Sequence, residues 1–186
     1  MISYDLCILG GGPGGFSAAI RAAKAGANVC LVDPGPLGGT CLNRGCIPAR
    51  ALGTTARLMG QLKKADALGI QIDGGIRLDL EKVLSRKERI LRRLRTGLGS
   101  LIRQNRITWL QGKGILQGPQ EVAVESPDKP AAGLRAKGII LATGSRPGSL
   151  PGCRPDGKTV VTSDDLLELR SLPASLIVVG AGVIGS

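Results

Sequence analysis

Two cysteines, Cys41 and Cys46, stand in the run Gly-Gly-Thr-Cys-Leu-Asn-Arg-Gly-Cys-Ile-Pro over residues 38–48. Cysteines this close together can form a tight redox-active disulfide, whereas a metal site usually needs further ligands. The chain contains no histidine, which weakens the metal interpretation and leaves no metal ligand set to predict. The spacing therefore favours a redox pair, and two ordinary buried cysteines are the alternative.

The spacing of the two cysteines does not suit a regular helix. In an ideal α-helix, positions i and i+5 are about 7.5 Å apart along the axis and rotated by roughly 140°. The Cα atoms of a disulfide are usually about 4.4–6.8 Å apart. We therefore expect a distorted helix start, which Gly45 and Pro48 permit or impose. A helix N-terminus would also lower a cysteine pKa and favour the thiolate.

A glycine-rich turn precedes the cysteines and is predicted to bind a nucleotide. Residues 4–9 read as a strand, residues 16–23 as a helix that ends at Gly26, and residues 29–32 as a second strand. This order is typical of a dinucleotide-binding βαβ unit. In such a unit the diphosphate lies at the helix N-terminus, and the acid after the second strand, here Asp33, binds a ribose diol. A glycine turn without a ligand is the alternative. The predicted binding residues are Gly10, Gly12, Pro13, Gly14, Gly15 and Asp33.

The cysteine run resembles, nearly residue for residue, the active-site motif of the flavoprotein pyridine nucleotide-disulfide oxidoreductases. The isoleucine after the second cysteine is most similar to the dihydrolipoamide dehydrogenase branch. The resemblance covers the whole chain, with three departures. Arg44 replaces a small or apolar residue, and Ala49-Arg50 replaces Ser-Lys or a similar pair.

The resemblance implies a mechanism in which electrons pass between a nicotinamide nucleotide, FAD and the Cys41–Cys46 disulfide. Cys41 would be the thiol that meets the disulfide substrate, and Cys46 would lie against the flavin as a thiolate. Arg50 keeps the positive charge of the usual lysine near the flavin, on a bulkier and planar group. Further FAD contacts would come from Gly39, Thr40, Gly114, Ala142, Thr143, Gly144 and Ser145.

The remaining pattern predicts an α/β fold with a Rossmann-like FAD-binding domain and an inserted antiparallel meander. Helices are expected over 51–64 and 79–104, separated by a loop that could include a short strand at 70–72. The meander would begin at residues 107–110 and continue through 114–116 and 121–124, with a turn at 127–130. Residues 138–141 would form another strand, ending at the Ala-Thr-Gly-Ser segment.

The end of the sequence predicts the start of a second Rossmann-like domain, which would bind NAD or NADP. After a linker at 148–158 and a helix at 163–169 capped by Ser163, residues 176–179 read as a strand. A second Gly-x-Gly-x-x-Gly turn follows at Gly180, Gly182 and Gly185. We therefore expect an FAD-binding domain at 1–150 and a truncated NAD(P)-binding domain at 151–186. The chain then reads as an N-terminal fragment, either non-catalytic by itself or part of a homodimeric enzyme.

Charge and composition bear on whether the chain binds nucleic acid or acidic proteins. The net charge is +11, and eight basic residues lie between Arg86 and Arg106. Leucines recur there at helical spacing, at Leu80, Leu84, Leu91, Leu94, Leu98 and Leu101. This predicts a solvated basic helix face rather than a nucleic-acid site, because no aromatic residue interleaves with it; acidic partner proteins are a further alternative.

The number of cysteines indicates the cellular compartment, and the family resemblance indicates the substrate. No secretory signal or membrane span is evident, and five cysteines without a signal fit a reducing cytoplasm. Cys7 and Cys30 fall in strand-like runs and are expected to be inert core residues, and Cys153 receives no role. The substrate would be a small-molecule or lipoyl-domain disulfide. A glutathione or mercuric reductase is the alternative to a dihydrolipoamide dehydrogenase.

Overall fold

The computed structural model describes residues 2–126 and 129–185. The chain divides into two compact units. The first comprises Met1–Cys46 and Leu91–Ser145, and the second comprises Ile47–Ile90 and Arg146–Ser186. The predicted division at residue 150 stays a prediction about the whole protein.

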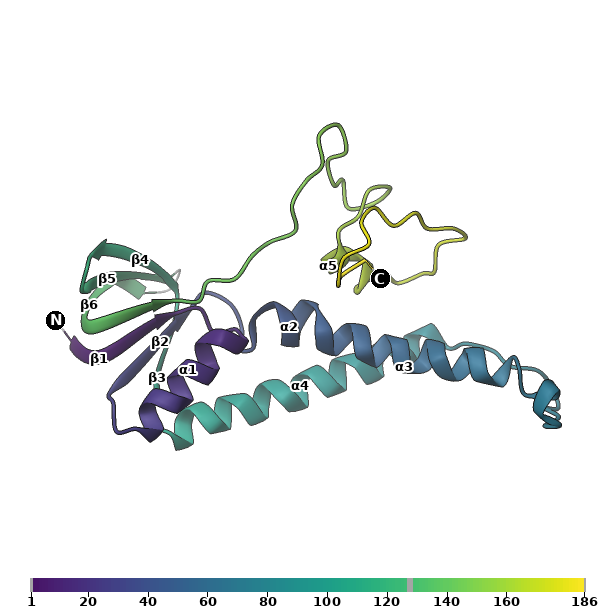
Figure 1. Ribbon diagram of the computed structural model, residues 1–186, viewed down its shortest axis with the longest axis horizontal. Helices are drawn as coiled ribbons and strands as arrows, with labels where there is room; N and C mark the ends of the chain where they lie inside the picture. The colour runs from purple at the N-terminus through teal and green to yellow at the C-terminus, as the bar shows by residue number, and fades with distance from the viewer. Residues whose placement is uncertain (1, 127–128, 186) are drawn as a thin grey trace. The chain divides into compact units, whose positions relative to one another are not determined.

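A six-stranded mixed sheet forms the first unit, in the order β3-β2-β1-β6-β5-β4 (Figure 1). Strand β1 (Ile2–Leu9) pairs in parallel with β2 (Val29–Asp33), and α1 (Pro13–Lys24) connects them. Strand β3 (Thr108–Gln111) continues the parallel part on the far side of β2. A βαβ unit of this kind is the core of a Rossmann-like fold, so the predicted fold class is confirmed.

The antiparallel part of the sheet comprises β4 (Lys113–Gly118), β5 (Glu121–Ser126) and β6 (Lys129–Leu141). Two details differ from the sequence prediction. The strand at 108–111 pairs in parallel with β2, so it does not begin the meander. The last strand of the meander is also continuous with the predicted strand at 138–141, which pairs in parallel with β1. Of the predicted turn at 127–130, residues 127–128 lie outside the described residues.

The end of β1 and most of β2 are buried on both faces, which explains their apolar sequences. On one face, Ile8 and Leu31 pack with residues of α1 and with Leu98 and Ile102. On the other face, Leu9 packs in a second cluster whose members from the meander are Val122, Val124, Leu134 and Ala136. The predicted core role of Cys7 and Cys30 is confirmed, because both side chains are fully buried.

Two long helices follow the cysteine run, namely α3 (Cys46–Leu62) and α4 (Leu80–Gln104), with a 3-10 turn η1 (Asp66–Leu68) between them. The optional strand at 70–72 is wrong, because these residues adopt no regular structure. The predicted apolar stripe of α4 is partly wrong. Leu94 and Leu101 are exposed, and Ile102 is buried in their place. Leu91 and Leu98 are buried as expected. The buried stripe thus runs from Leu91 to Leu98, seven residues on, and then to Ile102, four residues further.

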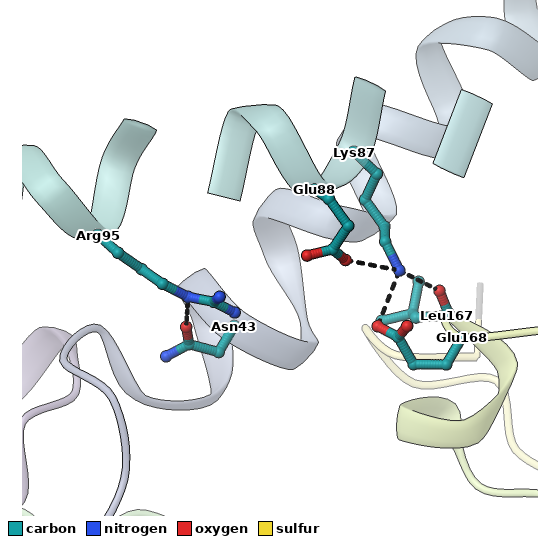
Figure 2. A network of polar contacts seen from close by, with 6 residues as sticks. All are labelled: Asn43, Lys87, Glu88, Arg95, Leu167 and Glu168. Carbon is teal, nitrogen blue, oxygen red and sulfur yellow. Dashed lines mark hydrogen bonds and ion pairs between the residues drawn. The ribbon is translucent and has the colours of Figure 1, made fainter. Parts of the chain in front are cut away.

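The basic residues of α4 do not all face solvent as predicted. Six of the eight are exposed, but the Lys87 side chain is 1% exposed and Arg95 is half-buried. Within the second unit, Lys87 Nζ donates to the Leu167 carbonyl and contacts Glu168 Oε1, both at 2.8 Å, and also pairs with Glu88 at 3.3 Å (Figure 2). Three acceptors satisfy the three ammonium hydrogens, which explains how this lysine is buried.

The last part of the second unit has little regular structure. Helix α5 (Ser163–Leu166) is shorter than predicted, and Thr162 caps it rather than Ser163, through a reciprocal capping box with Asp165. Residues 176–179 form no strand, and the side chains of Ile177 and Val179 are 89% and 70% exposed. A lone strand gains no ladder hydrogen bonds, so the apolar sequence alone does not create one here. In the part of the chain that the structure describes, no helix combines the length and apolarity needed to cross a membrane.

Candidate functional site

The carboxyl ends of three neighbouring strands meet at the first glycine turn. Gly10 N donates to Val32 O at 2.7 Å, and Ala142 N donates to Leu9 O at 2.8 Å. Gly10 has a φ of 112°, and a Cβ there would lie 2.1 Å from the Ala142 carbonyl oxygen. Only glycine combines this conformation with this close approach. The turn therefore lies at the edge of the sheet where open α/β folds bind their ligands.

The entrance to α1 fits an anionic group. Gly12 is the N-cap, Pro13 is the first helical residue, and the first turn contains no acid and no side-chain cap. A Cβ on Gly15 would lie 1.7 Å from the Gly10 carbonyl oxygen, so the helix packs directly onto the turn. A Cβ on Gly14 would meet nothing within 4 Å, which leaves open space beside the free N–H groups of the helix start. A diphosphate fits such a helix N-terminus.

Asp33 is the last residue of β2 and already holds the turn. Its Oδ2 accepts a hydrogen bond from Gly11 N, and its Oδ1 accepts one from Gly35 N at 2.7 Å. Each carboxylate oxygen has a second lone pair that a hydroxyl can use. The predicted ribose contact stays a prediction, and the structure adds a second role in fixing the backbone of the turn.

The cysteine run packs against this same turn. Gly38 N donates to the Gly11 carbonyl at 2.8 Å, and a Cβ on Gly39 would lie 2.5 Å from the Gly12 Cα. A side chain at Gly39 would therefore separate the two loops. The structure thus brings Gly39 and the adjacent, exposed Thr40 to the entrance of α1.

Cys41 lies within α2 (Gly39–Arg44), and Cys46 is the first residue of α3. Gly45 separates the two helices with φ −148° and ψ −113°, which is not helical. The expected distortion is confirmed and takes the form of a break between two helices. It brings the two thiols into hydrogen-bond contact, although both are free in this structure.

The hydrogen bond that the Cys41 thiol donates to Cys46 raises the pKa of Cys41, and burial and the nearby Cys46 sulfur raise it further. The Cys46 backbone N–H donates to the Cys41 sulfur and opposes this shift. The net direction is opposite to the lowering that we expected from a helix N-terminus. The reason is that the strongest neighbour of Cys41 is the other thiol. In the reduced pair, the raised pKa means that Cys41 holds its proton to a higher pH than an ordinary thiol does.

The other predicted site residues are distributed over both units. Within the first unit, a Cβ on Gly114 would lie 2.6 Å from Leu9 Cδ2, so this glycine lets β4 approach β1. Thr143, Gly144 and Ser145 follow the end of β6 and are exposed. Arg50 is exposed on α3 in the second unit, which also contains Gly180, Gly182 and Gly185. The cofactor contacts of all these residues stay predictions.

A second pair of thiols, Cys7 and Cys30, is adjacent across β1 and β2. Their mutual hydrogen bond and burial raise the pKa of Cys30. Neither side chain is exposed to solvent, so this pair cannot meet a substrate. Among the described residues, no cluster of three or more histidine, cysteine or acidic side chains could hold a metal ion.

Two residues that hold the cysteine run, Asn43 and Arg95, are not marked by the sequence motifs. Asn43 lies between the cysteines and is buried, and its side-chain oxygen accepts a hydrogen bond from Arg95 Nε. A polar residue inside the cysteine motif was a signal that could have identified Asn43. No local pattern marks Arg95, which resembles its basic neighbours on α4 in the sequence.

Comparison with known proteins agrees with this geometry. The family model described as pyridine nucleotide-disulphide oxidoreductase matches residues 4–186. The chain belongs to this family. The pyridine nucleotide-disulphide oxidoreductase match covers both glycine turns as well as the cysteine pair.

Several curated relatives are dihydrolipoyl dehydrogenases. One from Bacillus subtilis is 42% identical over 98% of this chain and 40% of its own length. One from Chlorobaculum tepidum is 39% identical over 98% of this chain and 39% of its own length. Dihydrolipoyl dehydrogenase 3 of Pseudomonas putida is 40% identical over 100% of this chain. The chain spans about 40% of the length of these relatives.

Proposed function

We propose that the chain is the FAD-binding and disulfide-bearing portion of a disulfide oxidoreductase of the dihydrolipoamide dehydrogenase type. The contact between the Cys41 and Cys46 thiols, at a helix break packed on the first glycine turn, carries this proposal. The family match and the dihydrolipoyl dehydrogenase relatives support the same reaction class. NAD is the expected nicotinamide nucleotide, and NADP is the alternative.

The residues of the first unit fit an FAD diphosphate at the α1 entrance and a ribose diol near Asp33. Bound FAD would supply two-electron chemistry between the cysteine pair and the nicotinamide nucleotide. Gly12, Gly14 and Gly39 supply close backbone and free N–H groups there, and Pro13 begins the helix without a donor of its own. Thr40, Gly114 and residues 142–145 complete the proposed cofactor contacts, together with Arg50. The second turn, at Gly180, Gly182 and Gly185, is proposed to begin the nicotinamide site.

The cysteines perform the sulfur chemistry by thiol–disulfide exchange. In the oxidised form, a substrate thiolate attacks the Cys41 sulfur and breaks its bond to Cys46. The second substrate thiol then attacks the mixed disulfide, so the substrate leaves as a disulfide and the chain holds two thiols. Two electrons pass from the substrate to the cysteine pair. Reduction of a disulfide substrate follows the same steps in reverse.

The substrate of the whole protein is proposed to be dihydrolipoamide, free or on a lipoyl domain. A glutathione or mercuric reductase remains the alternative, because the cysteine pair alone does not select a substrate. We also propose a cytoplasmic setting, which agrees with five free cysteines, and a homodimeric complete protein. A second candidate function is a flavin-binding unit without turnover, because the chain spans only about 40% of its relatives.

Substitution of Cys41 tests the proposal in the complete protein. Cys41→Ser should abolish lipoamide turnover and leave the flavin absorbance unchanged, because the serine hydroxyl cannot form a disulfide. Cys153→Ser is the matched control, since Cys153 lies in the second unit without an assigned role. Turnover retained in Cys41→Ser would contradict the proposal. Turnover by residues 1–186 alone would reject the non-catalytic candidate.

A further inference from the structure

The Asn43 side chain ties together the backbone that precedes the cysteine pair. Its Nδ2 donates to the carbonyl oxygens of Pro36 and Leu37, each at 3.2 Å, and of Gly39 at 2.9 Å. The residue is only 8% exposed and lies two positions after Cys41. One amide therefore connects the loop after β2, the first residue of α2 and the segment between the two cysteines.

Arg95 of α4 fixes the orientation of this amide. Its Nε donates to Asn43 Oδ1 at 2.5 Å, and the two side chains point toward one another in Figure 2. A guanidinium group can only donate, and backbone carbonyls can only accept. The Asn43 oxygen must therefore face Arg95, and its NH₂ group must face the loop. Reversing the amide would break every one of these contacts.

Helix α2 needs such support because its own interactions are few. It has six residues, its N-cap is Gly38 with φ 107°, and no side chain caps it. Helices this short are unstable without tertiary contacts. Cys41 lies within this helix, and the Gly45 break that leads to Cys46 comes directly after it. Movement of α2 would therefore separate the two sulfurs.

We propose that Asn43, oriented by Arg95, is a positioning residue that holds α2 so that the Cys41 and Cys46 sulfurs face each other. The pair thereby sets the equilibrium between the dithiol and the disulfide. Neither residue touches the substrate, and each acts through the cysteines. This inference rests on the proposed redox function of the Cys41–Cys46 pair.

The equilibrium can be measured with glutathione as the redox partner. The two thiols react with oxidised glutathione to give the Cys41–Cys46 disulfide and two reduced glutathione molecules. The glutathione S–S bond breaks as the protein S–S bond forms. Two electrons pass to glutathione, and the two cysteine protons end on its thiols. Thiol trapping followed by mass spectrometry gives the oxidised fraction of the complete protein at each glutathione ratio.

Two substitutions test the contacts of Asn43 with the loop and with Arg95 one at a time. Asn43→Asp keeps the size and the acceptor for Arg95, but it places a carboxylate oxygen against three carbonyls. We expect the equilibrium to shift toward the dithiol by about tenfold or more. Arg95→Met removes the donor but keeps much of the stem, and a shift of about threefold to tenfold is expected. Arg103→Met is the matched control, because the Arg103 side chain donates to Ser100 of its own helix and is exposed.

The double variant tests whether Arg95 acts through Asn43. If it does, adding Arg95→Met to Asn43→Asp should change the equilibrium less than Arg95→Met does alone. The pH profile of Cys41 alkylation provides a second readout, because loss of the contact with Cys46 should move its midpoint to lower pH. Circular dichroism reports whether each variant of the complete protein remains folded.

A shifted equilibrium and a shifted alkylation profile in folded Arg95→Met, with a wild-type response in Arg103→Met, would support the proposal. A wild-type equilibrium in Arg95→Met would overturn it, even if Asn43→Asp fails to fold. An equal shift in Arg103→Met would also overturn it. If the wild-type cysteines form no disulfide at any glutathione ratio, the proposed function fails first and this inference fails with it.

Discussion

The two glycine turns of this chain share their local geometry and differ in their surroundings. Gly10 and Gly180 have φ values of 112° and 115°. A Cβ on Gly15 would lie 1.7 Å from the Gly10 carbonyl oxygen, and one on Gly185 would lie 2.2 Å from the Gly180 oxygen. The same spacing of glycines thus produces the same close approach in both places.

The surroundings determine whether a turn becomes a site. The first turn ends a strand that pairs on both sides, and Ala142, Asp33 and Gly39 pack on it. The second turn follows residues 176–179, which are exposed and form no strand, and a Cβ on Gly180 would meet nothing within 4 Å. A glycine motif therefore sets a local bend, whereas a binding edge also requires neighbouring strands.

Alanine at the third glycine of each turn should give the largest difference. Gly15→Ala should destabilise the first unit by about 4 kcal/mol, because the new methyl group meets a carbonyl fixed by the sheet. Gly185→Ala should change stability by less than about 0.5 kcal/mol, because its exposed segment can relax. Denaturant unfolding followed by Trp109 fluorescence measures the first effect and circular dichroism the second. Equal losses in the two variants would contradict the comparison.

Alanine at the first glycine should give a smaller difference. Both positions have positive φ, which costs a non-glycine residue about 1–2 kcal/mol. Gly10→Ala adds a clash at 2.1 Å with the Ala142 carbonyl, so its total loss should reach about 3 kcal/mol. Gly180→Ala should show only the conformational cost. The same unfolding measurements apply, and a Gly10→Ala variant no less stable than Gly180→Ala would show that the packed surroundings do not matter.

Lowering the pH should produce the smallest effect, and it can be traced to a different carboxylate in each unit. Hydrogen bonds from Lys137 and from the Asn28 backbone hold the pKa of Asp5 below its ordinary 3.8 in the first unit. Backbone N–H groups of Lys158, Val160 and Thr159 do the same for the pKa of Asp156 in the second. Because both folded-state pKa values are lowered, their contributions are present above pH 3.8 and are lost as the pH falls through the folded-state values.

The free energy of unfolding, followed by Trp109 fluorescence, falls as the pH is lowered, and this fall is called the acid limb. Asp5→Asn should make the acid limb less steep. Asp156→Asn is the matched control and should leave that limb unchanged, because Asp156 belongs to the other unit. Both carboxylates are exposed, so the changes should be small and should decrease with added salt. An acid limb unchanged in Asp5→Asn would remove Asp5 as its cause.

The parts of the fold predicted from the sequence are those in which local pattern and packing agree. The βαβ unit carries its signal in apolar strands, a glycine turn and the helix stop at Gly26, and all of these appear in the structure. The strand at 176–179 has an equally apolar pattern and is absent, since pattern alone supplies no pairing partner. The pairing of β3 with β2 was also missed, because register between distant segments leaves no local mark.

The candidate site shows the same division. The proximity of Cys41 and Cys46 was predictable from their spacing and from Gly45. The raised pKa of Cys41 was not, because it depends on which group the thiol contacts after folding. The burial of Lys87 and the contact of Arg95 with Asn43 could not be predicted from the sequence either, because these residues differ from their basic neighbours only in position on α4.

Anaerobic reduction of the complete protein tests the central claim most directly. If the cysteine pair exchanges electrons with a bound flavin, titration with dithionite should consume roughly four electrons per flavin, two of them for the Cys41–Cys46 disulfide. The Cys41→Ser variant should consume only about two. A wild-type protein that binds flavin but takes up no more electrons than Cys41→Ser would contradict the account.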